Sequence, residues 1–330
     1  MSITVPADPM GPLGGYYQSL LLWRLFELGV FELVATPATA ESIAQRLHLR
    51  IEELRQCLEF IRVTTGWIDR DRQGRFRVAV GSAELLTLRF QVTKFVGAYG
   101  PLAQRLDRVL VEPEPGGHLV NRRALADAFI LTKDESRGVV AGMLLGASVS
   151  SLLDLGCGTA SLLVQLATAR NEFRGTGVDR DRAMCQAARA HVRSHGMSKR
   201  IRIRQADARE VDRLPDAGAL HAASLLNELF GRGPDEAVRF LQTIKERYPG
   251  RHCWIVDYYG QLGHNPPRNC GAPVKHALLH DLIQALSGQG VPPPDLKAWR
   301  KVYRSAAVRL LEAHEFGGAS MVWFVHRIVL

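Results

Sequence analysis

From residue 147 to its end, the chain alternates short apolar runs with segments that have the apolar spacing of helices. The runs SLLDLG, GTGVD and RIRIRQAD read as strands, and the segment TASLLVQLATAR between the first two reads as a helix. Repeated strand–helix units predict a parallel, doubly wound α/β sheet. The last two apolar runs meet across Gly317 and Gly318, which predicts a terminal β-hairpin.

The first part of the chain has a different pattern. Residues 15–34 are apolar all round, which is typical of a helix buried between partners and makes this segment a candidate dimerisation helix. A capped short helix is expected over 39–47 and a second helix over about 51–63. Strand-like residues at 67–68 and 75–80 flank a turn. Helix, helix and β-ribbon in this order predict a winged helix.

A winged helix often binds DNA, so that function has to be weighed. The second helix carries Glu52, Glu53 and Glu59 against Arg55 and Arg62, a face poorly suited to phosphates or guanine edges. A structural, dimer-forming role is therefore favoured. The expectation of a homodimer rests on one set of large apolar residues, more than a domain of about ninety residues can bury. These are Leu20, Leu21, Leu22, Trp23, Leu25, Phe26 and Val30.

Composition places the chain among globular proteins. Its 330 residues are 46% hydrophobic and 23% charged, which excludes disordered, collagen-like and coiled-coil classes, and the length favours two domains of unequal size. No stretch has the ~18 consecutive apolar residues of a membrane span, and residues 1–15 lack the features of a signal peptide. We therefore expect a cytoplasmic protein without a membrane partner.

Charge and cysteines narrow the picture further. The net charge is +9, but the main basic run, residues 199–204, alternates with isoleucines and predicts a half-buried strand with a solvated face. The five cysteines are far apart and contain no C-x-x-C pair, so neither a disulfide framework nor a thiolate zinc site is expected. Nucleic acid is not an expected partner.

A glycine-containing loop carries the strongest chemical signal. Residues 154–160, DLGCGTA, follow an apolar strand and open a helix, so the glycines allow a tight turn and a close approach to a ligand. Asp179 lies at the end of the next strand, as in dinucleotide-binding folds. However, Ser161 stands where the third glycine of G-x-G-x-x-G belongs. Asp154 would repel a pyrophosphate but can accept hydrogen bonds from a cationic amino-acid ligand.

The loop resembles the first motif of class I S-adenosylmethionine-dependent methyltransferases. The resemblance implies that Asp179 binds both ribose hydroxyls and that the turn 206–208 contacts the adenine. The terminal hairpin matches the antiparallel last strand of that family. The expected cofactor-binding residues are Asp154, Gly156, Gly158, Asp179, Arg180, Asp207 and Ala208.

The N-terminal part further resembles the dimeric small-molecule methyltransferases, including plant and actinobacterial O-methyltransferases. The expected domains are a winged-helix dimerisation domain over 1–95, a helical connector with the acceptor pocket over 96–146, and the S-adenosylmethionine-binding catalytic domain over 147–330. In that family a histidine after the fourth strand of the catalytic domain deprotonates the acceptor. Here Asn227 stands in that region, and an amide cannot take a proton.

A candidate catalytic set lies nearby. His276 and His280 share one helix face, and Glu228 follows the fourth strand of the catalytic domain. The stretches LLNELFGRGPDEAVRFL and IVDYYGQLG loosely resemble C-methyltransferases of 2-oxo acids. That resemblance implies His280 as the base or a metal ligand and Glu228 as the residue that orients it or takes the proton. Some of its members hold iron through two histidines, so iron is a candidate second cofactor whose ligands stay unassigned.

Three functions follow from this reading. The leading one is methylation of the β-carbon of a small, anionic 2-oxo acid in natural-product biosynthesis. The alternative is O- or N-methylation of a larger natural product. The third is a nucleic-acid methyltransferase or a winged-helix regulator, which would bind DNA or RNA with a steep salt dependence.

Overall fold

The computed structural model describes residues 10–112, 116–131, 135–264, 266, 270–317 and 321–330. The chain forms two compact units. Unit 1 comprises Met1–Pro101 and Asp127–Thr132, and unit 2 comprises Leu102–Ala126 and Lys133–Leu330. The division into three domains at residues 95 and 146 stays a prediction.

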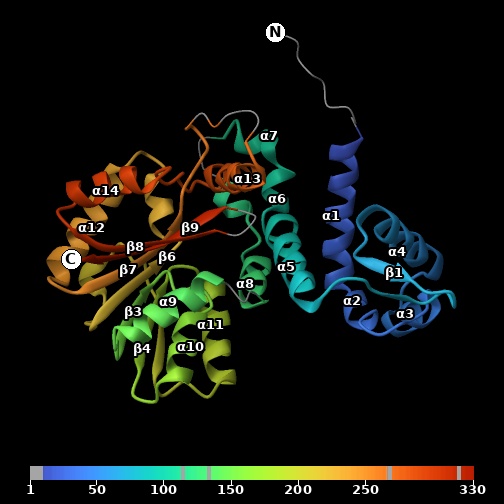
Figure 1. The fold of residues 1–330 in the computed structure, drawn as a ribbon, viewed down its shortest axis with the longest axis horizontal. Coiled ribbons are helices and arrows are strands. Elements are labelled where there is room, and N and C mark those ends of the chain that lie inside the picture. The colour runs from blue at the N-terminus through green and yellow to red at the C-terminus, as the bar shows by residue number, and fades with distance from the viewer. Residues whose placement is uncertain (1–9, 113–115, 132–134, 265, 267–269, 318–320) are drawn as a thin grey trace, which may run out of the picture. The chain divides into compact units, whose positions relative to one another are not determined.

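Unit 1 is mainly helical (Figure 1). Thr39 caps its third helix as expected, because its Oγ1 accepts a hydrogen bond from the backbone N–H of Ser42 at 3.2 Å. The two short strands pair antiparallel, with Ile68 opposite Val78. The predicted order of helix, helix and ribbon is therefore present, and the name winged helix stays a prediction. The elements are α1 (Gly11–Glu27), α2 (Val30–Leu33), α3 (Ala40–Leu47), α4 (Ile51–Thr65), β1 (Ile68–Arg70), β2 (Phe76–Val78), α5 (Ser82–Val92), the π-helix η1 (Thr93–Ala98) and the start of α6 (Gly100–Ala103).

Part of the apolar set from which a homodimer was expected is buried inside unit 1, so that argument is partly wrong. Leu22, Leu25, Phe26 and Val30 are buried in the core of unit 1, against residues of α2, α3 and α4. The apolar side chains of α1 that are exposed lie at its other end instead. They are Leu13, Tyr16 and Tyr17, each more than half exposed. Counting apolar residues overestimated the uncovered surface because α2, α4 and α5 pack against α1.

Unit 2 contains a seven-stranded sheet in the order β5-β4-β3-β6-β7-β9-β8. The strands pair in parallel except at β7–β9 and β9–β8, which are antiparallel. This confirms the α/β fold with its terminal hairpin, although part of the hairpin turn at 318–320 lies outside the described residues. The strands are β3 (Ser151–Leu155), β4 (Arg174–Asp179), β5 (Ile201–Gln205), β6 (Ala219–Ala223), β7 (His252–Tyr258), β8 (Arg309–Gly317) and β9 (Val322–Val329).

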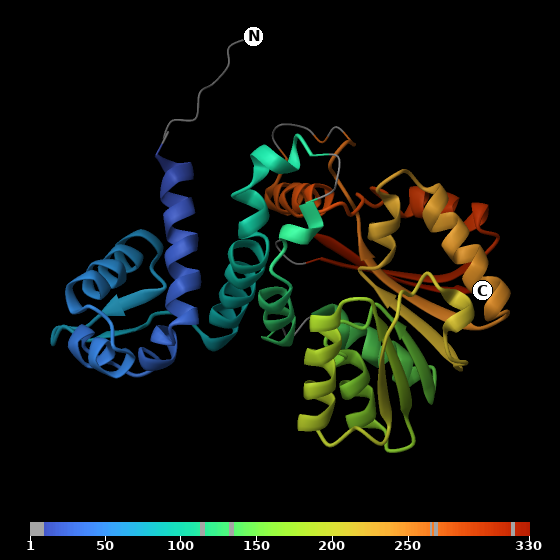
Figure 2. The same cartoon turned by 180° about the vertical axis from the view of Figure 1, so that it is seen from behind.

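Helices cover both faces of this sheet (Figures 1 and 2). One core joins β-strand residues to α12 and α14, and a second core joins the opposite face to α9, α10 and α11. Apolar side chains on both faces explain why these strands read as nearly continuous hydrophobic runs. The remaining helices are α7 (Leu106–Val109), η2 (Gly116–Leu119), α8 (Arg122–Leu131), α9 (Glu135–Gly146), α10 (Ser161–Ala169), α11 (Arg182–Ser194), η3 (Val211–Arg213), η4 (Leu226–Phe230), α12 (Asp235–Arg247), α13 (Ala272–Leu286) and α14 (Leu296–Ser305).

Two expectations about the surface can be compared with this fold. The basic run at 199–204 leads into β5 at the edge of the sheet, where Ile201 is buried while Arg202 and Arg204 are exposed, so it is a half-buried strand as predicted. Charged side chains on an edge strand oppose pairing with other chains. Among the described residues, no helix is both long and apolar enough to cross a membrane.

Candidate functional site

The loop after β3 turns sharply at the carboxyl end of the sheet. Gly156, Gly158 and Ala160 all have left-handed backbone angles, with φ of 70°, 51° and 58°. Only glycine adopts this conformation without strain, and Ala160 holds it at the first position before α10. Apart from its chain neighbours, none of the described residues has an atom within 4 Å of the point where a Cβ on Gly158 would sit. The loop therefore leaves open space beside its backbone, as a ligand cradle requires.

Asp179 at the end of β4 faces this loop. Its Oδ2 accepts a hydrogen bond from the backbone N–H of Gly158 at 3.0 Å, and its Oδ1 accepts one from the N–H of Asp181 at 2.8 Å. Burial raises the pKa of the Asp179 carboxyl, while these two backbone hydrogen bonds lower it. The carboxylate is thus fixed by the main chain and retains lone pairs for the two hydroxyls of a ribose.

Asp154 has a partner inside the protein. It lies opposite His221 in the parallel pair of β3 and β6, and its Oδ1 is 2.7 Å from Nδ1 of His221, with both side chains buried. This oxygen is therefore engaged within the sheet. The expected role of Asp154 in binding a cationic ligand stays a prediction.

The turn after β5 contains the expected adenine-side residues. Asp207 accepts hydrogen bonds from both the backbone and the side chain of Arg209, at 2.9 and 3.0 Å, and the guanidinium lowers the pKa of the Asp207 carboxyl. Arg209 also lies 3.6 Å from Glu236 on α12, while Ala208 is buried. These contacts hold the turn in place next to the ends of β4 and β5.

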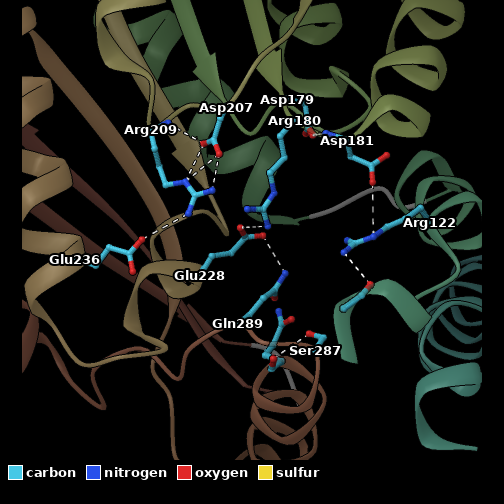
Figure 3. Close-up of polar contacts among 12 residues, drawn as sticks. Arg122, Asp179, Arg180, Asp181, Asp207, Arg209, Glu228, Glu236, Ser287 and Gln289 are labelled. Carbon is cyan, nitrogen blue, oxygen red and sulfur yellow. Dashed lines mark hydrogen bonds and ion pairs between the residues drawn. The ribbon is translucent and has the colours of Figure 1, made fainter. Parts of the chain in front are cut away.

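Arg180 and Glu228 were expected to have separate roles, and the structure joins them. Figure 3 shows the two side chains pointing toward each other, with Nη2 of Arg180 2.7 Å from Oε2 of Glu228. The other carboxylate oxygen accepts a hydrogen bond from Nε2 of Gln289 at 2.9 Å. Burial raises the pKa of Glu228, and the arginines around it lower the pKa. Arg122, which the sequence analysis missed, lies 3.6 Å from Asp181 beside this group.

The backbone segments that carry Glu228 and Gln289 lie close to each other at Gly290. A Cβ on Gly290 would lie 2.2 Å from the carbonyl carbon of Phe230, and a Cβ on Gly117 would lie 2.7 Å from the oxygen of Ser287. Any larger residue would push these segments apart. The segment after α13 is therefore held against η4 on one side and against η2 on the other.

Asp257 and Asn227 form a second buried pair, and the sequence analysis did not single out Asp257. Oδ2 of Asp257 accepts a hydrogen bond from the backbone N–H of Asn227 and Oδ1 accepts one from the N–H of Tyr258, both at 3.0 Å. Burial raises the pKa of Asp257 to about 7. The sequence feature that could have identified Asp257 is an acidic residue at the carboxyl end of a buried strand. The same feature predicted Asp179.

The candidate catalytic histidines lie on α13. His280 is buried and packs edge-on against Tyr258, with ring centroids 4.6 Å apart, whereas His276 is exposed. The hydrogen-bond and ion-pair partners of Glu228 among the described residues are Arg180 and Gln289, so the expected pairing of Glu228 with His280 is not formed. The catalytic roles of these residues stay predictions.

A metal site was left open by the sequence. The part of the chain that the structure describes contains no group of three or more His, Cys, Asp or Glu side chains that could hold a metal ion. The candidate iron therefore has no ligand set there.

The fold and this site define a class of protein, the class I methyltransferases that use S-adenosylmethionine. Residues 152–247, from β3 to the end of α12, match the family model described as Methyltransferase domain. The seven-stranded sheet, the glycine loop and the acidic residue after β4 agree with that match. The chain thus carries an S-adenosylmethionine-dependent methyltransferase domain.

Particular relatives extend the comparison. Methyltransferase ungE' of Aspergillus campestris (strain IBT 28561) is 23% identical over 206 residues, which are 60% of this chain and 56% of that protein. The match thus spans little more than half the length of this curated relative.

Two solved structures are similar over nearly the whole chain. Mitomycin 7-O-methyltransferase MmcR has a TM-score of 0.70 at 20% identity, over 97% of this chain and 96% of its own. Human N-acetylserotonin methyltransferase, solved in complex with S-adenosylmethionine, has a TM-score of 0.69 at 16% identity, over 100% of this chain and 99% of its own. At these identities the likeness shows the fold.

Proposed function

We propose that this protein transfers the methyl group of S-adenosylmethionine to an oxygen or nitrogen atom of a small natural product. The observation that carries the proposal is the contact between Gly158 and Asp179, which places a fixed carboxylate beside an open glycine loop. Support also comes from the full-length likeness to a mitomycin 7-O-methyltransferase. Fold alone would not assign a function, so the site is the main support.

The chemistry needs few protein groups. When bound, S-adenosylmethionine supplies a methyl group on a sulfonium; the acceptor's lone pair forms the new bond to carbon, the old carbon–sulfur bond breaks, and its electrons return to sulfur. The acceptor's proton leaves to solvent. Asp179 and the loop at 156–158 hold the cofactor, and the segments around Glu228 and Gln289 enclose the reacting groups. Positioning two reactants in this way can supply much of the rate.

Asn227 stands where related O-methyltransferases have a histidine base. Since an amide takes no proton at neutral pH, the acceptor is an aromatic amine, whose lone pair is free at that pH, or a hydroxyl that is acidic by itself. The same departure favours a second candidate, methylation of the β-carbon of a 2-oxo acid, in which His280 acts as the base. Both candidates use the same cofactor site.

The proposal extends to assembly and location. The exposed apolar side chains at the start of α1 support a homodimer formed through the N-terminal unit. A cytoplasmic location fits the use of S-adenosylmethionine as co-substrate. The acidic residues on α4 speak against a role in nucleic-acid binding.

A methyl-transfer screen tests the proposal. The protein is incubated with S-adenosylmethionine carrying a labelled methyl group and with phenols, aromatic amines and 2-oxo acids, and products are identified by mass spectrometry. We expect label on oxygen or nitrogen, and at least tenfold less of it with Asp179→Ala at the same protein concentration and a subsaturating concentration of S-adenosylmethionine. Label on carbon next to a ketone would establish the second candidate. A protein that binds no S-adenosylhomocysteine would overturn both.

A further inference from the structure

Buried amide atoms without hydrogen-bond partners gather at one place in unit 2. Asn227 is wholly buried, and neither its Oδ1 nor its Nδ2 has a partner among the described residues. The same holds for Oε1 of Gln284 and for Oε1 of Gln289. Buried polar atoms normally find partners, so a local cluster that lacks them indicates a place where a ligand supplies them.

Hydrogen bonds show that these three residues are neighbours. The backbone N–H of Gly290 donates to the carbonyl oxygen of Asn227 at 3.0 Å, and the N–H of Gln289 donates to the carbonyl oxygen of Gln284 at 2.8 Å. Asn227 belongs to η4, and the two glutamines belong to the end of α13 and the loop after it. We call Asn227, Gln284 and Gln289 the amide junction.

The main chain of Asn227 is held from two sides while its side chain is not. Asp257 accepts a hydrogen bond from the backbone N–H of Asn227, and the N–H of Gly290 donates one to the carbonyl oxygen of Asn227. The close fit of Gly290 against Phe230 keeps both segments in register. The amide is therefore presented in a fixed orientation, which is what a group that recognises an acceptor needs.

Charge around the amide junction opposes an anionic acceptor. Three arginines act on Glu228, and each of them is already in an ion pair with a carboxylate. Asp257 is close enough to Glu228 and Asp281 for their charges to raise its pKa. Each of these arginines is thus offset by a carboxylate, and Asp257 and Asp281 add further carboxyl groups near Glu228. An added negative charge would be repelled.

We propose that the amide junction binds the methyl acceptor and selects one that is uncharged and carries hydrogen-bond donors and acceptors next to the reacting atom. An amide offers a donor and an acceptor in one plane without net charge. This inference rests on the proposed function, and it replaces the anionic acceptor expected from sequence by a neutral one.

Three matched probes test the charge preference. These are 3,4-dihydroxybenzamide, 3,4-dihydroxybenzoate and 3,4-dihydroxybenzylamine, which present the same hydroxyls with a neutral, an anionic and a cationic substituent. We expect kcat/KM for the benzamide to exceed that for either charged probe at least tenfold, which is about 1.4 kcal/mol. A preference for the carboxylate or for the amine overturns the proposal, and so does failure to methylate all three while S-adenosylhomocysteine still binds.

Two substitutions test the residues themselves. Asn227→Leu and Gln284→Met keep the approximate shape and remove the unsatisfied polar atoms, so the urea midpoint of unfolding should stay equal or rise. Each should lower kcat/KM for the benzamide at least tenfold and leave the affinity for S-adenosylhomocysteine within twofold. Gln186→Met, on the exposed face of α11, is the matched control and should change neither quantity.

The possible failures are distinguishable. A clear fall in the urea midpoint of Asn227→Leu would show that the amide has a structural partner, and the proposal would be overturned. Unchanged kcat/KM in both variants would overturn it as well. Loss of S-adenosylhomocysteine binding by the wild-type protein would instead refute the proposed function on which it rests.

Discussion

A side chain at Gly158 should block cofactor binding, and Gly196 offers a matched control. Both glycines have left-handed backbone angles, φ of 51° and 69°, and both have open space where a Cβ would lie. Gly158 belongs to the loop after β3, whereas Gly196 follows α11 on the surface. Gly158→Val and Gly196→Val therefore impose the same kind of backbone strain, about 1–3 kcal/mol. Only the first fills the space beside Asp179.

Two measurements separate the effect on ligand binding from the effect on stability. Calorimetry should show at least a tenfold weaker binding of S-adenosylhomocysteine for Gly158→Val, about 1.4 kcal/mol, and binding within twofold of wild type for Gly196→Val. Denaturant unfolding should show that both variants are folded and lose similar stability, about 1–3 kcal/mol. If both variants bind the ligand as tightly as the wild type, the loop at 156–158 is not the cofactor cradle.

Three further predictions concern the cofactor, pH and assembly. Asp179→Ala should weaken S-adenosylhomocysteine binding by about 1.5–3 kcal/mol in calorimetry, because hydrogen bonds to a charged group are lost; an unchanged affinity would contradict this. Asp257 has a folded pKa of about 7, above its usual 3.8, so its contribution to stability falls as pH rises from about 4 to about 7. In urea unfolding, wild type should therefore lose stability relative to Asp257→Asn between about pH 4 and about pH 7, and a constant difference would refute the assignment. Light scattering should give about twice the chain mass of 36.5 kDa, since Leu13, Tyr16 and Tyr17 are exposed; a monomer at micromolar concentration would count against the dimer.

The turn of the glycine loop and the sheet could be predicted because they follow local rules. The glycines at 156 and 158 interrupt an apolar run at the point where the backbone adopts positive φ, and glycine is the residue that does so without strain. Asp179 could be placed because carboxyl ends of neighbouring parallel strands meet at one edge. Both inferences need only the order of strands, which the alternation of strands and helices provides.

The partners of side chains on separate segments could not be predicted in this way. The sequence shows His280 within an apolar stretch, but whether it faces the reacting groups depends on how α13 rotates against β7 and β9. In the structure this face of α13 packs against Tyr258 and Trp323. Likewise, Arg180 and Glu228 are 48 residues apart, and their ion pair depends on the crossing of two loops that no local pattern describes.

The local structure around Asn227 depends on Asp257. β6 and β7 are parallel neighbours, so Asp257 near the end of β7 reaches the backbone that follows β6. The two carboxylate oxygens of Asp257 accept hydrogen bonds from the backbone N–H groups of Asn227 and Tyr258. Burial raises the pKa of Asp257 to about 7. A carboxyl group engaged in this way stabilises the backbone around residue 227 and does not orient an imidazole at that position. The local structure therefore favours an uncharged side chain there.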